Sequence, residues 1–244
     1  MTHTTKHPFA TLLLLLAVAL AAISCRPSTQ TGGPVDRDSD TINSTPPVTL
    51  NAGEDKPRIL MLHGGGSSAA GFARQRGVRD LAEALPQYTF VFADAPEPGG
   101  LWLRDPPSKS QPSTDPGWAD RSVEYLDAFV EEHGPFHAVV AYSQGCPMAL
   151  VYLAHAPADT FQKAALFNGY APTTHLGLLG TIDDDAPFTT PTLVFSGEHD
   201  VFADLAPGLA ERFQSPATVH SPTAGHHLPY ESDPTFQQVI DFLR

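Results

Sequence analysis

Short apolar runs alternate with longer amphipathic stretches along most of the chain. Residues 58–63 and 88–93 are short and largely apolar, which is typical of strands buried on both faces. Residues 121–133 instead place Val123, Leu126 and Phe129 at helical spacing. The same pattern predicts further strands at 138–142, 164–167, 192–195 and 218–220, and further helices at 78–85, 147–155, 204–213 and 234–243.

Strict alternation of strands and helices predicts an α/β fold, because such connections build a parallel sheet with helices on both faces. We expect a compact parallel sheet of about five to six strands. The segment 171–190 lies where a lid could be inserted, but at about 20 residues it is too short for a separate lid domain. The Asp183-Asp184-Asp185 run within it predicts a solvated turn.

The chain begins with a weakly basic stretch followed by an apolar run at 9–23. At about 15 residues this run is short for a membrane span, which needs about 20, so it indicates an export signal. The sequence AISC at 22–25 resembles a bacterial lipobox, in which the cysteine is lipidated. We therefore expect a signal peptide at 1–25, lipidation of Cys25 and an exported protein anchored in the cell envelope. Plain secretion and an uncleaved anchor are the alternatives.

Residues 26–56 are rich in Pro, Ser, Thr, Gly and Asp and poor in large apolar residues, which predicts a disordered tether. The folded domain is then expected at 57–244. Cys146 is the only other cysteine, so a lipidated Cys25 leaves it as a buried thiol without a disulfide partner.

The formal net charge is −13. This charge argues against nucleic acid or an anionic membrane surface as a direct partner, because phosphate binding needs clustered Lys and Arg. A small uncharged or cationic substrate fits better.

Ser143 lies in HAVVAYSQGCPMALVYLA at 137–154, between a predicted strand and a predicted helix. The stretch approximates the G-x-S-x-G nucleophile elbow, with Ala141 in place of the first glycine. A serine at this junction could instead cap the following helix. A nucleophilic serine needs a base, a group that orients the base, and donors for an oxyanion.

Asp200 and His226 follow later predicted strands and supply the remaining partners. Functional groups collect at the carboxyl ends of parallel strands, and the chain order Ser143, Asp200, His226 is that of an α/β-hydrolase triad. Asp204 is the rival acid, but it falls at the start of the next predicted helix and is expected to cap it.

The loop at 224–227 offers two adjacent histidines, His226 and His227, of which one can face Ser143. Metal binding is an alternative because His220 is close in sequence, but no carboxylate or thiol stands at ligand spacing. We therefore expect no metal site.

HGGG at 63–66 ends the first predicted strand and lacks the continuation of a phosphate-binding loop. Its glycines suit an oxyanion loop, with donors expected from the backbone N–H of Gly65 and of Gln144. His63 is expected to be structural.

Five stretches carry a resemblance to a known family: LHGGGSSAAGF at 62–72, VFADAPEP at 91–98, GPFHAVVAYSQG at 134–145, PTLVFSGEHD at 191–200 and AGHHLP at 224–229. Together they resemble the small FSH serine hydrolases of the α/β-hydrolase superfamily. The resemblance implies an esterase or thioesterase that works without a cofactor. It also implies roles of nucleophile, acid and base for Ser143, Asp200 and His226, and it favours His226 over His227.

The Pro-rich loop at 99–117 and its C-terminal flank carry Leu101, Trp102 and Trp118, which we expect to contact substrate. The predicted function is hydrolysis of carboxylic esters of short to medium acyl chains through an acyl-enzyme. The alternative is a non-catalytic envelope lipoprotein that uses a hydrolase scaffold to bind a ligand or partner.

Overall fold

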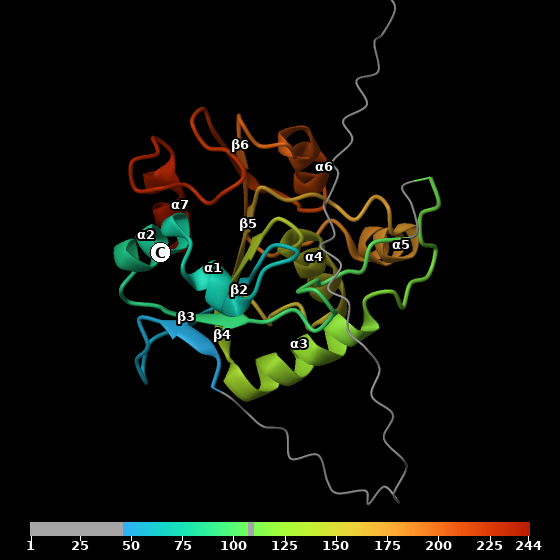
Figure 1. Cartoon of the computed structure of the whole chain (residues 1–244), viewed down its shortest axis with the longest axis horizontal. Helices are drawn as coiled ribbons and strands as arrows, with labels where there is room; N and C mark the ends of the chain where they lie inside the picture. The colour runs from blue at the N-terminus through green and yellow to red at the C-terminus, as the bar shows by residue number, and fades with distance from the viewer. Residues whose placement is uncertain (1–45, 107–109) are drawn as a thin grey trace, which may run out of the picture. The chain divides into compact units, whose positions relative to one another are not determined.

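The protein is built on one seven-stranded sheet, which the computed structural model describes together with its helices over residues 46–106 and 110–244 (Figure 1). The strand order is β1-β3-β2-β4-β5-β6-β7, in which β1 runs antiparallel to β3 and all other neighbours are parallel. The strands are β1 (Val48–Leu50), β2 (Arg58–Leu62), β3 (Thr89–Ala93), β4 (Phe136–Tyr142), β5 (Lys163–Phe167), β6 (Thr192–Gly197) and β7 (Ala217–Ser221).

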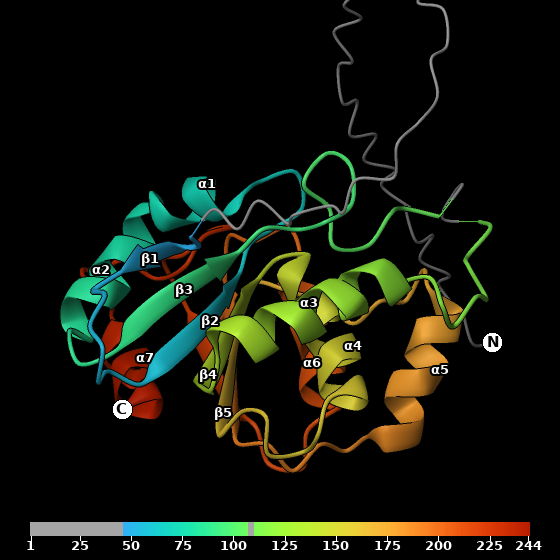
Figure 2. The ribbon, with the colours of Figure 1, turned by 90° about the horizontal axis from the view of Figure 1, so that it is seen from below.

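Helices cover both faces of this sheet (Figures 1 and 2). On one face lie α1 (Ala69–Ala73), α2 (Arg76–Ala84) and α7 (Phe236–Leu243). On the other lie α3 (Asp120–His133), α4 (Gly145–His155), α5 (Leu176–Asp185) and α6 (Ala206–Ala210), with the short 3-10 helix η1 (Ala203–Leu205) before α6.

The central strands are apolar apart from a residue at or near their starts, because both of their faces are buried. In β2, Ile59 and Met61 pack toward α1, α2 and α7, whereas Leu60 and Leu62 pack toward the opposite helices. All four side chains are fully buried. The predicted α/β fold is thus confirmed, with six parallel strands as the alternation indicated and one additional antiparallel strand.

The additional strand, β1, corrects the predicted domain boundary. Val48 pairs with Phe92 and Leu50 pairs with Phe90, so the folded unit includes residues that we assigned to the tether at 26–56. A three-residue strand is too short to produce a recognisable period within a polar, Pro-rich stretch. The predicted signal peptide, Cys25 and the tether as far as residue 45 lie outside the described residues.

Two predictions in the C-terminal half also need correction. Asp183–Asp185 are the last residues of α5 rather than a turn, because Leu178 and Ile182 bury one side of this helix. The predicted helix at 204–213 is divided into η1 and the five-residue α6, which has Pro207 in its first turn. In the part of the chain that the structure describes, no helix combines the length and apolar character needed to cross a membrane.

Candidate active site

Ser143 occupies a sharp turn between β4 and α4. Its φ of 53° lies in the left-handed region, where non-glycine residues are uncommon. The backbones are close here, since a Cβ at Gly145 would come within 2.6 Å of the Leu62 carbonyl oxygen. Ala141, in contrast, is fully buried in the core and pairs with Leu62 across β4 and β2. The turn therefore needs a glycine at the second position of the motif, Gly145, whereas the first position accommodates the methyl group of Ala141.

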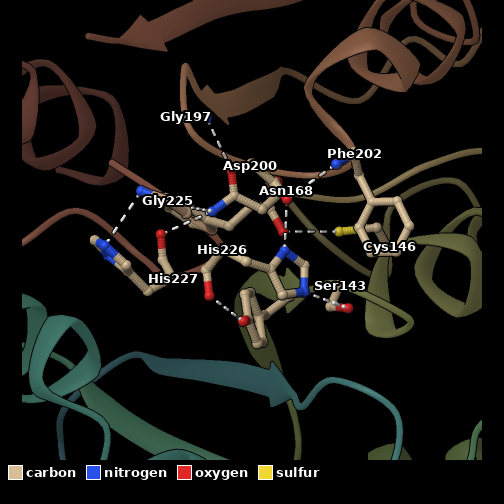
Figure 3. A network of polar contacts seen from close by, with 11 residues as sticks. Ser143, Cys146, Asn168, Gly197, Asp200, Phe202, Gly225, His226 and His227 are labelled. Atoms are coloured by element: carbon tan, nitrogen blue, oxygen red, sulfur yellow. Dashed lines mark hydrogen bonds and ion pairs between the residues drawn. The ribbon is translucent and has the colours of Figure 1, made fainter. Parts of the chain in front are cut away.

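The structure brings the three predicted triad residues into one hydrogen-bonded chain (Figure 3). The distance from Ser143 Oγ to His226 Nε2 is 3.0 Å, and that from His226 Nδ1 to Asp200 Oδ1 is 2.8 Å. The Asp200 side chain is completely buried, and its Oδ1 also accepts a hydrogen bond from the N–H of Phe202. A fixed carboxylate in this position orients the imidazole so that Nε2 faces the serine.

The neighbouring His227 points away from Ser143 (Figure 3). Its Nδ1 lies 2.9 Å from the Leu228 carbonyl oxygen, and its ring stacks on Tyr230 at 4.3 Å. His220, the third histidine considered for a metal, instead contacts Glu198. No group of three His, Cys, Asp or Glu side chains suited to a metal ion occurs among the described residues.

Tyr142 supports the histidine loop, a role that the sequence did not indicate. Its hydroxyl donates a hydrogen bond of 2.6 Å to the His226 carbonyl oxygen. Burial, with a further contribution from Asp200, raises the pKa of Tyr142 to about 12. The hydroxyl therefore stays protonated and remains a donor at neutral pH.

The glycine loop after β2 lies directly against the serine turn. A Cβ at Gly64 would be 3.1 Å from Cβ of Ser143, and one at Gly65 would be 3.1 Å from the Gln144 side chain. Within residues 46–106 and 110–244, no protein group accepts a hydrogen bond from the backbone N–H of Gly65 or Gln144. Both backbone N–H groups thus lie at or next to the serine turn without a protein acceptor in the described part of the chain.

The side chain of Gln144 fixes the following loop to the site. Its Oε1 accepts from the Trp102 N–H and its Nε2 donates to the Leu103 carbonyl, both at 2.9 Å. The Trp102 indole donates to the His63 carbonyl at 2.8 Å and is fully buried. This burial corrects the expectation that Trp102 contacts substrate, because its ring has no free surface and serves to pack the loop.

The other two residues proposed to contact substrate differ in position. Leu101 is half-buried and follows Gly100, whose carbonyl accepts a hydrogen bond from the N–H of Gly66 in the glycine loop. Trp118 donates its indole N–H to the Arg104 carbonyl and lies under the Arg104 guanidinium. Among the described residues, Trp118 makes no hydrogen bond or ring contact with Ser143 or His226, so of these two residues only Leu101 lies in a segment bonded to the glycine loop.

His63 has the structural role that we expected. It is fully buried, its Nδ1 donates to the Gly64 carbonyl at 2.8 Å, and its Nε2 accepts from the Ala95 N–H at 3.1 Å. This pattern requires the neutral ring, since a protonated Nε2 could not accept. Burial lowers the pKa of His63, and the contacts with Gly64 and Asp94 offset part of that effect.

Because the pKa of His63 is lower in the folded than in the unfolded chain, its contribution to stability is complete above the unfolded value of 6.5. As the pH falls below 6.5, the unfolded chain takes up a proton that the folded protein resists, and the free energy of unfolding should decrease. Urea denaturation across this range measures the decrease, which should be smaller in His63→Gln. An equal decrease in both proteins would contradict the assignment.

Proteins of known structure share this fold. Esterase PE8 superposes with a TM-score of 0.57 at 19% identity, covering 81% of this chain and 97% of that one. A carboxylesterase from Mesorhizobium loti gives the same TM-score at 20% identity, covering 80% and 92%. The fold and the hydrogen-bonded Ser-His-Asp chain together define a protein of the α/β-hydrolase class.

Sequence comparison identifies the family within that class. The family model described as Serine hydrolase (FSH1) matches residues 101–238, and the chain belongs to this family. The relative named Esterase FUS5, from Gibberella moniliformis, is 29% identical over 213 residues, covering 77% of this chain and 86% of its own. The predicted family and the prediction of a hydrolytic enzyme are confirmed.

Proposed function

We propose that this serine hydrolase cleaves carboxylic esters through an acyl-enzyme, with Ser143 as nucleophile, His226 as general base and acid, and Asp200 as the residue that orients His226. The observation that carries the proposal is the continuous contact from Ser143 Oγ through His226 to the buried Asp200. The esterases among its relatives agree with an ester as the substrate.

The proposed reaction has two matching halves. Ser143 Oγ attacks the ester carbonyl carbon while His226 Nε2 takes the hydroxyl proton, and the negative charge moves to the carbonyl oxygen. The free N–H groups of Gly65 and Gln144 are suited to bind that oxygen. Collapse expels the alcohol, which takes the proton from His226. Water activated by the same imidazole then releases the acid and restores Ser143.

Two apolar surfaces beside the triad fit the two sides of an ester. The leaving oxygen receives its proton from His226, so the alcohol lies on the side of that ring. There the Phe202 ring packs edge-on against the imidazole, with centroids 5.2 Å apart, and the Tyr170 ring packs against Phe202 at 5.0 Å. Phe202 and Tyr170 are both half-buried. We assign the acyl side to the loop that carries Leu101. Trp118 remains a proposed substrate contact on the sequence alone.

A non-catalytic ligand-binding protein is the competing function. It would not need an imidazole held between a serine hydroxyl and a buried carboxylate, nor two backbone N–H groups left without protein acceptors beside that serine. Both features are what acyl transfer requires, and on this ground we favour catalysis.

Ser143→Ala should lower kcat/KM on a p-nitrophenyl ester by about 10⁴-fold or more and abolish labelling by a fluorophosphonate probe, because the nucleophile is lost. His226→Ala should have a comparable effect on kcat/KM. His227→Ala is the matched control, and its loss should stay within about tenfold because its ring faces away from the serine. Labelling that survives Ser143→Ala would reject Ser143 as the nucleophile. Loss of activity in His227→Ala but not in His226→Ala would show that His227 is the base.

Esters of short to medium acyl chains are the proposed substrates. Each buried CH₂ contributes about 0.8 kcal/mol, so kcat/KM should rise from p-nitrophenyl acetate to butyrate and stop rising where the chain extends beyond Leu101 into solvent. A series from acetate to palmitate measures this. A continuous rise to palmitate would show a long acyl channel and contradict the proposal.

Export and lipid attachment through Cys25 complete the proposed function, supported by the apolar run at 9–23 and the AISC sequence at 22–25. Metabolic labelling with an alkyne fatty acid in a bacterial host should tag the full chain and fail to tag Cys25→Ala. The Cys25→Ala variant should keep its esterase activity because residue 25 lies outside the catalytic domain. Labelling that persists in Cys25→Ala would contradict lipidation at this position.

A further inference from the structure

Asn168 follows β5 directly beneath the histidine and aspartate loops. It is 1% exposed, and its φ of 50° places it in the left-handed region. Asparagine tolerates this conformation better than most residues because its side chain is short and polar. The position is therefore suited to asparagine by its backbone alone, and any further role must come from the side chain.

The side-chain amide of Asn168 makes three hydrogen bonds (Figure 3). Its Nδ2 donates to the carbonyl oxygens of Gly225 at 3.1 Å and His227 at 2.7 Å. Its Oδ1 accepts from the N–H of Gly197 at 3.0 Å. Both amide hydrogens and the oxygen are thus engaged by the backbone, and the buried side chain has no surface for a substrate.

These three partners belong to the two loops that carry the base and the acid. Gly225 and His227 flank His226 on either side. Gly197 begins the turn to Asp200, whose N–H donates to the Gly197 carbonyl at 3.0 Å. The side-chain amide of Asn168 therefore links the residues on either side of His226 to the turn that positions the Asp200 carboxylate.

Together with Tyr142, Asn168 binds three successive carbonyl groups of the histidine loop. The Asn168 amide donates to the carbonyl groups of Gly225 and His227, and the Tyr142 hydroxyl donates to that of His226. These donors come from the ends of β5 and β4, which are neighbours in the sheet. Apart from the backbone bond from the His199 N–H to the Ala224 carbonyl, the loop is thus held to the strand ends by side chains, so its geometry depends on them.

We propose that Asn168 is a positioning residue for catalysis, which holds His226 so that its two ring nitrogens reach Ser143 and Asp200 together. This inference rests on the proposed function of the triad. The distances of 3.0 and 2.8 Å on opposite sides of one ring leave little freedom, because a shift of the loop that keeps one hydrogen bond lengthens the other. Asn168 touches neither the serine hydroxyl nor the imidazole and acts through the backbone alone.

Two substitutions test the hydrogen bonds of the Asn168 side chain separately from the left-handed backbone at this position. Asn168→Gly removes all three hydrogen bonds, and glycine adopts a φ near 50° without strain. Asn168→Asp keeps the acceptor for Gly197 but replaces the donor by a carboxylate oxygen that faces two carbonyl oxygens. Both should lower kcat by about ten- to a hundredfold, the effect expected of a catalytic group displaced by about 1 Å, with KM changed by less than about twofold.

A low-field proton NMR resonance provides the readout that a merely structural role would not move. The proton between His226 Nδ1 and Asp200 Oδ1 should give such a resonance in the wild type, identified by its absence in His226→Ala. It should weaken or disappear in both Asn168 variants while near-UV circular dichroism shows them folded.

Asn51→Gly is the matched control. Asn51 also has a positive φ, of 57°, and its Nδ2 donates to the Ala82 carbonyl. It follows the end of β1 that pairs with the start of β3, whereas the proposed triad follows the ends of the parallel strands. This variant should lose stability but keep the wild-type kcat and the low-field resonance.

Wild-type kcat and resonance in Asn168→Gly and Asn168→Asp would overturn the proposal. A kcat that falls only in proportion to the folded fraction would equally overturn it, since Asn168 would then be structural. Ser143→Ala, measured in parallel, separates this outcome from failure of the proposed function, because an active Ser143→Ala protein would reject the triad whatever the Asn168 variants do.

Discussion

The left-handed backbone of Ser143 is the constraint on which the rest of the site depends. A non-glycine residue in this conformation is strained by about 1–3 kcal/mol and persists only where its surroundings enforce it. The Ser143 N–H donates to the Phe167 carbonyl on the neighbouring strand, and its own carbonyl accepts from Cys146. Gly145 meanwhile passes against the Leu62 carbonyl. The strands that form the core therefore also fix the serine, and Ala141 is compatible with the turn because its methyl group belongs to that core.

Most polar side chains around the serine bind backbone and leave the reacting groups free. Gln144 holds the Trp102 loop, His63 ties the glycine loop to the end of β3, and Tyr142 and Asn168 hold the histidine loop. Each of these three loops thus has its own attachment at or next to a strand end. This arrangement gives loops the precision that catalysis needs, which a flexible connection could not supply.

The sequence predicted those features that depend on local pattern and chain order. Continuous apolar runs located six strands, and the order of Ser143, Asp200 and His226 at strand ends identified three side chains that the structure joins by hydrogen bonds. Prediction from the sequence failed where the role of a residue depends on partners that are distant in the chain. Trp102 reads as an exposed aromatic in a Pro-rich loop, yet its indole finds a buried acceptor 39 residues away at His63. The sequence assigned no role to Asn168, because its partners lie on loops after two later strands.

The burial of Asp200 determines which protonation state of His226 the carboxylate stabilises most. Its side chain is completely enclosed, so its negative charge has lost solvation by water and depends on the groups around it. Before reaction, a neutral imidazole offers it one N–H. In the proposed reaction, the same contact becomes an ion pair when His226 takes the proton from Ser143, and beside the buried carboxylate this attraction is stronger than in water. In this proposal Asp200 stabilises the charged state that forms during attack more than the resting state, and such a difference is what accelerates a reaction. Since the gain depends on the contact between Asp200 and His226, the hydrogen bonds that fix the two loops act on the same step.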